Sequence, residues 1–292
     1  MKSKLYIDPA PDFSFKATVY SHGWCELAPF GLDDENWRLN FVFLTPRRKV
    51  VPVVLFEEAG RIAIEADTKV AEPEFVMDAT RHLLRLDDDL TGLYNVISGD
   101  DRLGWIAERR AGRLLRSPTV FEDLVKTICT TNCSWGLTKS MVTNLVEKLG
   151  LAASNGKKAF PTPEAMAGVP ADFYRDEVRA GYRSPYFVEL AQAVAAGDLD
   201  PESWLTSELP TPELKKEMKK VKGVGDYAAE NLLKLVGRYD GLALDSWLRA
   251  QFYKTHNAEK VCADKKIEKH YKKFGEWRGL VIWCDMTEKW IT

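Results

Sequence analysis

A short glycine-containing segment and a carboxylate that follows it have the residue types and the spacing of a site for an anion. Residues 221–227 read VKGVGDY, and Asp245 lies 20 residues beyond Gly225, the second glycine of this segment. Two glycines around one apolar residue allow a tight backbone turn whose N–H groups come close to a ligand, and the positive end of a following helix favours an anion. The pattern predicts a phosphate-binding turn with a carboxylate nearby, a geometry that suits a nucleic-acid backbone.

The elements that must position these residues are helices. Residues 228–236 have the apolar spacing of a helix, and Gly237 can supply the left-handed residue that commonly ends one. Together with the helix expected before the glycine turn, they predict a helix-hairpin-helix at about residues 213–237. A further helix is expected at residues 246–253, and Asp245 stands where aspartate is a preferred N-cap. Capping would keep this carboxylate ionised and fixed in orientation.

The rest of the chain divides into two patterns. Apolar and polar residues alternate as in strands at residues 13–19, 37–41 and 61–65, with turn signals between them. Residues 73–86 carry apolar side chains at helical spacing, so we expect this helix to cover one face of an antiparallel sheet. His82 lies on that apolar stripe, which favours a core or interface histidine.

Beyond these strands the pattern is helical, with short turns that contain glycine or proline. Residues 123–149 carry an apolar helical stripe, but the polar run at 130–134 predicts a break in it. Four further helices are expected to begin near a proline, over residues 163–167, 170–180, 185–196 and 212–221. The sequence predicts an α+β protein: a small N-terminal domain (1–92) with an antiparallel sheet covered by a helix, then a larger all-helical domain (93–292) that contains the helix-hairpin-helix.

Composition limits the classes of protein. The chain has 292 residues, 45% of them hydrophobic, and can bury a sizeable core. Its N-terminus has no signal-peptide stretch, and no run approaches the roughly 20 apolar residues of a membrane span. Its five scattered cysteines suit reduced thiols better than a disulfide framework or a clustered iron–sulfur loop. We expect a protein that is neither secreted nor membrane-bound, cytoplasmic (with the nucleoid) in a bacterium or nuclear in a eukaryote.

The distribution of charge favours the same end of the chain as the glycine turn. The net charge of −2 would by itself disfavour binding to nucleic acid. Residues 1–96, however, hold 11 Lys and Arg against 16 Asp and Glu, whereas residues 211–292 hold 17 against 12. The lysines at 215, 216, 219 and 220 also fit the simpler interpretation of a solvated helix face.

With these residues in view, the chain resembles a known family. The block from Lys219 to Tyr253 resembles the helix-hairpin-helix and Gly/Pro…Asp signature of the base-excision DNA glycosylases. Two earlier blocks, RLLR at 113–116 leading to ICTTN at 128–132 and GYRSPY at 181–186, are similar in order and spacing to the 8-oxoguanine branch. The likeness covers about residues 110–290 and extends to the 3-methyladenine DNA glycosylase II branch. It implies a monomer whose partner is double-stranded DNA with a damaged base. The pocket for the damaged base is expected in the cleft between the two domains.

The resemblance assigns the chemistry to Asp245. As water attacks C1′ and the glycosidic bond breaks through an oxocarbenium-like state, a carboxylate can stabilise the cation and accept the water's proton. In bifunctional relatives, a lysine two residues beyond the second hairpin glycine attacks the sugar. That position is Tyr227 here. Because a phenol cannot form a Schiff base, we expect hydrolysis without strand cleavage.

The resemblance also implies residues that hold the DNA. An asparagine enters the gap left by the extruded base, an aromatic–arginine pair wedges the opposite strand, and the hairpin binds phosphate. The hairpin carbonyls of Lys219, Val221 and Val224 are expected to hold a monovalent cation, and no other cofactor is required. Without the family, Asn132 would be a helix break and Tyr182 a packed turn residue. The implied DNA-binding residues are Lys222, Gly223, Val224, Gly225, Asn132, Tyr182 and Arg183.

The identity of the base is the least determined part. Glycosylases that recognise 8-oxoguanine carry a glutamine and a phenylalanine at the positions of Gly279 and Trp283 here. The polar side chain that contacts the base in those enzymes is therefore missing. A pocket of Tyr227, Trp283 and Trp247 would stack a cationic alkylated purine of the 3-methyladenine type, with roughly 0.5–2 kcal/mol per ring. The leading hypothesis is therefore a monofunctional glycosylase for an alkylated purine.

Two alternatives stay open at this point. One is an 8-oxoguanine glycosylase with an altered pocket. The other is a non-catalytic helix-hairpin-helix protein that binds DNA, which the acid at position 245 disfavours because a pure binder has no need for it.

Overall fold

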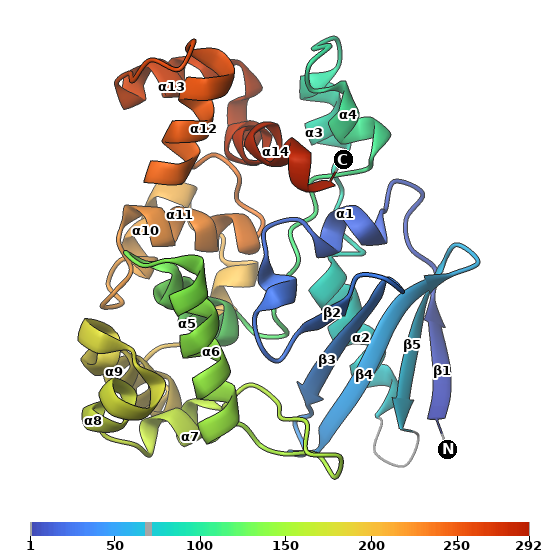
Figure 1. The fold of residues 1–292 in the computed structure, drawn as a ribbon, viewed down its shortest axis with the longest axis vertical. Helices are drawn as coiled ribbons and strands as arrows, with labels where there is room; N and C mark the ends of the chain where they lie inside the picture. The colour runs from blue at the N-terminus through green and yellow to red at the C-terminus, as the bar shows by residue number, and fades with distance from the viewer. Residues whose placement is uncertain (1, 68–71, 292) are drawn as a thin grey trace.

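The computed structural model describes residues 2–67 and 72–291, and its ribbon shows a sheet beside a larger group of helices (Figure 1). The strands are β1 (Lys2–Ile7), β2 (Gly31–Asp33), β3 (Arg38–Leu44), β4 (Val50–Glu58) and β5 (Arg61–Asp67). The helices up to the middle of the chain are α1 (Phe15–Val19), α2 (Pro73–Leu84), α3 (Thr91–Ile97), α4 (Gly104–Glu108), α5 (Val120–Thr130), α6 (Trp135–Leu149) and α7 (Pro163–Ala167).

The remaining helices make up the second half of the chain. They are α8 (Ala171–Phe173), α9 (Ser184–Ala196), α10 (Thr211–Met218), α11 (Asp226–Leu235), α12 (Ser246–His256), α13 (Asp264–Tyr271) and α14 (Arg278–Ile291). Short 3-10 or π-helical turns are η1 (Trp24–Glu26), η2 (Tyr174–Val178), η3 (Gly181–Arg183), η4 (Pro201–Thr206) and η5 (Lys272–Trp277). Among the described residues, no helix has the length and apolar character needed to cross a membrane.

The five strands form one antiparallel sheet in the order β1-β5-β4-β3-β2. A two-residue turn joins β4 to β5, where Ala59 and Gly60 both have positive φ, as tight hairpins require. Helix α2 covers the sheet as expected: the ring of Phe75 packs edge-on against Phe43 of β3, with 6.1 Å between ring centroids. The α+β architecture predicted from the sequence is confirmed.

The expected strand at residues 13–19 is wrong. This segment forms helix α1, and the Ser14 side chain caps it by accepting a hydrogen bond from the Ala17 N–H at 3.2 Å. Within so few residues, alternating apolar side chains fit one face of a strand and a nearly buried helix equally well, and here Phe15, Ala17 and Val19 are all buried. The sheet has a strand at the very start of the chain, β1, which pairs with β5 on the side opposite β4.

The predicted break near residue 132 is confirmed. Helix α5 ends at Thr130 and α6 begins after Ser134, whose side chain accepts a hydrogen bond from the Leu137 N–H at 3.3 Å. Asn132 between them has positive φ, a conformation that asparagine tolerates better than most residues. The helix expected over residues 170–180 is replaced by the short α8 and a π-helical turn, and Arg179 in the left-handed conformation ends it.

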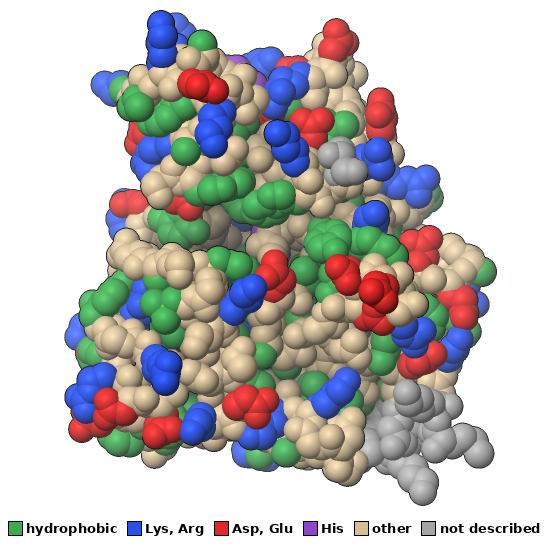
Figure 2. All heavy atoms as spheres, viewed as in Figure 1, with side chains coloured by type: hydrophobic (Ala, Val, Ile, Leu, Met, Phe, Trp, Pro, Cys, Tyr) green, Lys and Arg blue, Asp and Glu red, His purple; other side chains and the backbone are tan. Residues whose placement is uncertain are grey.

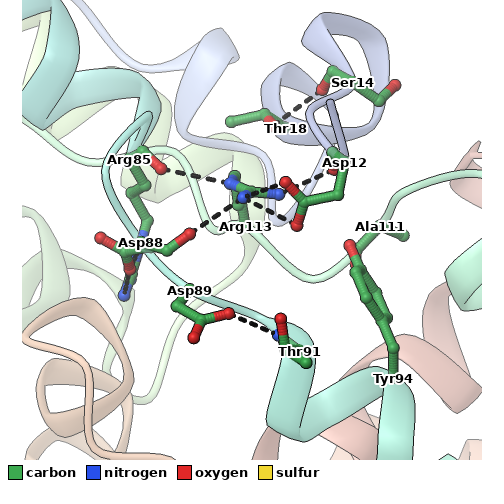
Figure 3. A network of polar contacts seen from close by, with 10 residues as sticks. All are labelled: Asp12, Ser14, Thr18, Arg85, Asp88, Asp89, Thr91, Tyr94, Ala111 and Arg113. Atoms are coloured by element: carbon green, nitrogen blue, oxygen red, sulfur yellow. Dashed lines mark hydrogen bonds and ion pairs between the residues drawn. The ribbon is translucent and has the colours of Figure 1, made fainter. Parts of the chain in front are cut away.

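One continuous group of buried side chains runs through the sheet and the helices. The fully buried side chain of Arg113 joins the segment before α1 to the segment that follows α2 (Figure 3). Its guanidinium donates hydrogen bonds to the Arg85 and Asp88 carbonyls and to the carboxylate of Asp12 at 3.1 Å. Residues far apart in sequence are thereby tied together beside the segment that leads to α5. The division at residue 92 into two domains stays a prediction.

Candidate active site and nucleic-acid interface

The hairpin predicted at residues 213–237 is formed by α10, a tight turn and α11. Gly223 has φ +90°, and the Val224 N–H donates to the Val221 carbonyl at 3.0 Å. A Cβ on Gly223 would lie 3.0 Å from the Tyr186 ring, whereas a Cβ on Gly225, the N-cap of α11, would meet nothing within 4 Å. A side chain at the first glycine would therefore strain the turn, and the second glycine leaves open space beside the first N–H groups of a helix, where an anion binds well.

Two lysines of the hairpin are paired with carboxylates. Lys222 is exposed, and its ammonium lies 2.6 Å from Glu189. Lys219 lies 2.9 Å from Asp226, in the first turn of α11. These exposed pairs are worth little in water. A DNA phosphate can replace Glu189 as the partner of Lys222, so the ion pair does not prevent the predicted contact.

Asp245 is the N-cap of α12. Its Oδ1 accepts a hydrogen bond from the Leu248 N–H at 2.7 Å, and its side chain is half-buried. This capping bond fixes the orientation of the carboxylate and leaves its second oxygen without a hydrogen bond to a described residue. The cap expected from the sequence is confirmed, and it is compatible with a catalytic role for the same side chain.

Asp245 lies where two cavities meet. The larger, of about 920 Å³, is a groove lined by the hairpin turn, Asn132, Tyr182 and Arg249. The smaller, of about 650 Å³, is a pocket between α5, α11, α12, α14 and the segment from Tyr20 to Glu26. Asp245 and Tyr227 line both cavities. Figure 2 shows that this face of the molecule is hollowed across its middle, with hydrophobic side chains along the hollow.

The structure brings Asn132 and Tyr182 together at the groove. Both are exposed, and the Asn132 amide donates to the Tyr182 hydroxyl at 3.3 Å. Arg183 is placed differently: it is buried and donates to the Ile128 carbonyl at 3.2 Å and to the Thr131 hydroxyl at 3.3 Å. Its guanidinium also lies 4.5 Å from the centroid of the Tyr182 ring. In this geometry, Arg183 positions the loop that carries Asn132 and supports Tyr182 from behind.

Aromatic side chains dominate the pocket. Trp247, Trp283 and Trp290 form a cluster with ring centroids 5.3–6.0 Å apart. The Trp283 indole N–H donates to the Ser21 carbonyl at 2.8 Å, which fixes its ring. Burial, with a further contribution from the Asp245 charge, raises the pKa of Tyr227 to about 12, so its phenol stays neutral. The three pocket residues predicted from the sequence are therefore brought together around one cavity.

The absence of a polar side chain at position 279 has a structural cause. Gly279 lies near the start of α14, and its N–H donates to the Tyr239 carbonyl at 2.7 Å. A Cβ on Gly279 would overlap the Gly241 carbonyl oxygen. Helix α14 packs so closely on residues 239–241 that no side chain fits at this position, which excludes a glutamine without rearrangement of the backbone.

The sequence analysis missed several polar side chains of the pocket, Lys234 among them. Lys234 is buried, and burial lowers the pKa of its ammonium to about 8, against the opposing effects of Glu230 and Asp245. Thr127 and His22 also line the pocket. A signal for Lys234 was available, because it lies seven residues after Tyr227 and hence two turns along the same helix face. No comparable signal existed for Thr127 or His22.

Comparison with known proteins identifies the fold through solved structures. No protein-family model matches this chain, and no curated protein matches it significantly. Among solved structures, the 3-methyladenine DNA glycosylase of Archaeoglobus fulgidus superposes with a TM-score of 0.77 at 18% identity over 98% of each chain. The 8-oxoguanine glycosylase/lyase of Clostridium acetobutylicum, bound to double-stranded DNA, gives 0.75 at 20% identity over 99% of this chain and 98% of its own. The chain shares the fold of these enzymes over nearly its whole length.

Proposed function

We propose that this protein is a DNA glycosylase that hydrolyses the N-glycosidic bond of a damaged purine. One observation carries the proposal: the fixed carboxylate of Asp245 lies where the hairpin groove meets the aromatic pocket. A DNA strand in the groove can extrude a nucleotide into the pocket, so that its sugar passes Asp245. Enzymes named for this activity share the fold, which agrees with the proposal.

The reaction needs only groups that the chain holds. The bond from C1′ to the purine nitrogen breaks and its electrons pass to the base, while Asp245 stabilises the positive charge on the sugar. A water molecule then bonds to C1′ and gives its proton to the carboxylate. The capping bond from Leu248 prepares the side chain for both roles, because it restricts the carboxylate without neutralising it.

We infer that the enzyme is monofunctional. The position of the lyase lysine in the family that the sequence resembles is Tyr227, whose phenol stays protonated at neutral pH. It cannot form an imine with the sugar, so the abasic product leaves without strand cleavage. We also propose a cation on the Lys219, Val221 and Val224 carbonyls, since carbonyl oxygens are ligands for hard cations. Its place at the hairpin turn assigns it to DNA binding.

Two classes of damaged purine suit different features of the pocket. The tryptophan cluster favours an alkylated purine, because electron-poor rings stack well on indoles. This class is the first candidate. An oxidised purine such as 8-oxoguanine is the second, favoured by one observation: the pocket contains the buried ammonium of Lys234.

A panel of duplexes, each with one lesion, tests the proposal. The protein is incubated with duplexes that contain 3-methyladenine, 7-methylguanine, hypoxanthine or 8-oxoguanine, and abasic products are cleaved with alkali. We expect at least one lesion to be excised, with strand breaks only after alkali and no adduct on addition of borohydride. Tight binding without excision of any lesion would instead identify a DNA-binding protein, and a trapped adduct would contradict the monofunctional assignment.

A further inference from the structure

Three polar atoms of the aromatic pocket lack the partners that buried polar atoms normally have. The Thr127 hydroxyl and the His22 Nε2 atom are buried without any hydrogen bond. The Lys234 ammonium has one long bond, at 3.3 Å, to the Leu242 carbonyl. All three residues line the same cavity. Unpaired buried polar groups are rare in native proteins and costly, and a ligand group that completes them is a common reason for their presence.

The hydrogen bonds around His22 are compatible with a ring that carries its proton on Nε2. The Leu115 N–H donates to the Ser21 hydroxyl oxygen at 2.9 Å, which leaves the hydroxyl proton free to bond the His22 Nδ1 atom, also at 2.9 Å. Burial lowers the pKa of His22 to about 3, helped by nearby positive charges that include Lys234, so the ring is neutral at pH 7. A neutral imidazole that accepts at Nδ1 carries its proton on Nε2. In this tautomer, His22 presents a donor to the pocket.

We propose that Lys234, Thr127 and His22 form a donor floor in the pocket, which recognises a carbonyl oxygen on the extruded base. An ammonium, a hydroxyl and an Nε2–H can all donate to such an oxygen. The exocyclic amine of an adenine lesion would face these groups donor to donor. The inference rests on the proposed function and narrows it to damaged purines that carry a carbonyl group, methylated guanines among them.

Two methylated purines separate this recognition from stacking and charge. As lesions, 7-methylguanine and 3-methyladenine both carry a positive charge, but only the first has a carbonyl oxygen. Single-turnover excision is measured for both, and for hypoxanthine, after correction for spontaneous depurination. Affinity for the same duplexes is measured in parallel, so that the donor floor is tested even if no base is released. We expect the parent protein to prefer 7-methylguanine and hypoxanthine.

Lys234→Met is the decisive variant. It keeps an unbranched side chain and removes a buried charge. Replacing buried charges by apolar side chains of similar volume is often neutral or stabilising. We expect excision of 7-methylguanine and hypoxanthine to fall about 10- to 100-fold, the range for loss of a hydrogen bond from a charged donor. Excision of 3-methyladenine should stay the same. Thr127→Val, which keeps the shape of the side chain, should lower excision in the same direction by less. Lys148→Met, at an exposed ion pair with Glu177, is the control.

Three results would overturn the donor floor. The first is an equal loss on all lesions in Lys234→Met, because that would place Lys234 in the support of Asp245. The second is a parent protein that prefers 3-methyladenine to 7-methylguanine in both excision and affinity. The third is a borohydride adduct that disappears in Lys234→Met, which would make this amine a nucleophile. If the parent protein excises nothing, the proposed function fails separately, and the affinities alone decide the donor floor.

Discussion

The hairpin groove and the aromatic pocket meet at Asp245 but are built in opposite ways. One wall of the groove is the backbone of a short glycine turn, whose N–H groups carry no information about a base, and Asn132, Tyr182 and Arg249 line it elsewhere. The pocket presents side chains from several segments far apart in the sequence, both indole rings and a few buried polar atoms. If the proposed function holds, this difference predicts a division of labour in which the groove binds any DNA and the pocket selects the base. The predictions below test this division.

The largest effect is expected at the shared residue. Asp245→Asn keeps the capping bond, since asparagine caps helices about as well as aspartate. It removes the charge that faces the developing cation, so single-turnover excision should fall by roughly 10²- to 10³-fold. Binding of a lesion duplex and the melting temperature should stay close to those of the parent. Excision at a comparable rate would show that Asp245 only caps α12.

Helix α14, which carries Trp283 of the pocket, should tolerate substitution poorly at Gly279. A Cβ there would overlap the Gly241 carbonyl, so Gly279→Ala must displace α14 and should cost about 2–4 kcal/mol of the free energy of unfolding. Gly136→Ala in α6 is the matched control, because a Cβ at that site meets nothing within 4 Å and alanine favours a helix. Urea denaturation of both variants measures the difference. Equal stability would mean that position 279 is open to a side chain.

The groove should respond to substitution without regard to the base. Gly225→Asp places a carboxylate where a phosphate is expected, and we predict about a tenfold loss of affinity for every duplex, damaged or not. Lys222→Ala should reduce the slope of log affinity against log salt by about one. Titrations at several salt concentrations measure both quantities. A loss confined to lesion duplexes would contradict the division between groove and pocket.

The smallest effect concerns stability at mildly acidic pH. Burial lowers the pKa of His82 to about 4 and that of His22 to about 3, below the ordinary value of 6.5. As pH falls below 6.5, the unfolded chain takes up these protons before the folded one does, so stability is fully present above pH 6.5 and is lost as the pH falls toward 4 and then 3. Each histidine should cost about 1 kcal/mol by pH 5.5.

Denaturation of the parent and of His82→Gln at pH 7.5, 6.5 and 5.5 measures this loss. The variant should lose less stability than the parent between pH 6.5 and 5.5. A parallel pH dependence in the two proteins would mean that His82 does not contribute to it.

The difference between groove and pocket also explains what the sequence determines by itself. The hairpin, the cap at Asp245 and the break at Asn132 all follow from local rules about glycine, capping side chains and runs of polar residues, and the structure confirms each. The strand expected at residues 13–19 failed because its alternation over a few residues also fits the buried helix α1.

Only the tertiary structure decided which side chains line the aromatic pocket. Trp283 reaches the carbonyl of Ser21, and Lys234 is buried in the same cavity as His22, although these residues are separated by most of the chain. No local pattern marks such a pair, because packing of α11 and α14 against the N-terminal segment creates it. The close approach of α14 to Gly241 likewise removes the space for a side chain at position 279. Local sequence therefore determined the hairpin turn and the capping carboxylate of Asp245, whereas long-range packing determined the shape and polarity of the aromatic pocket.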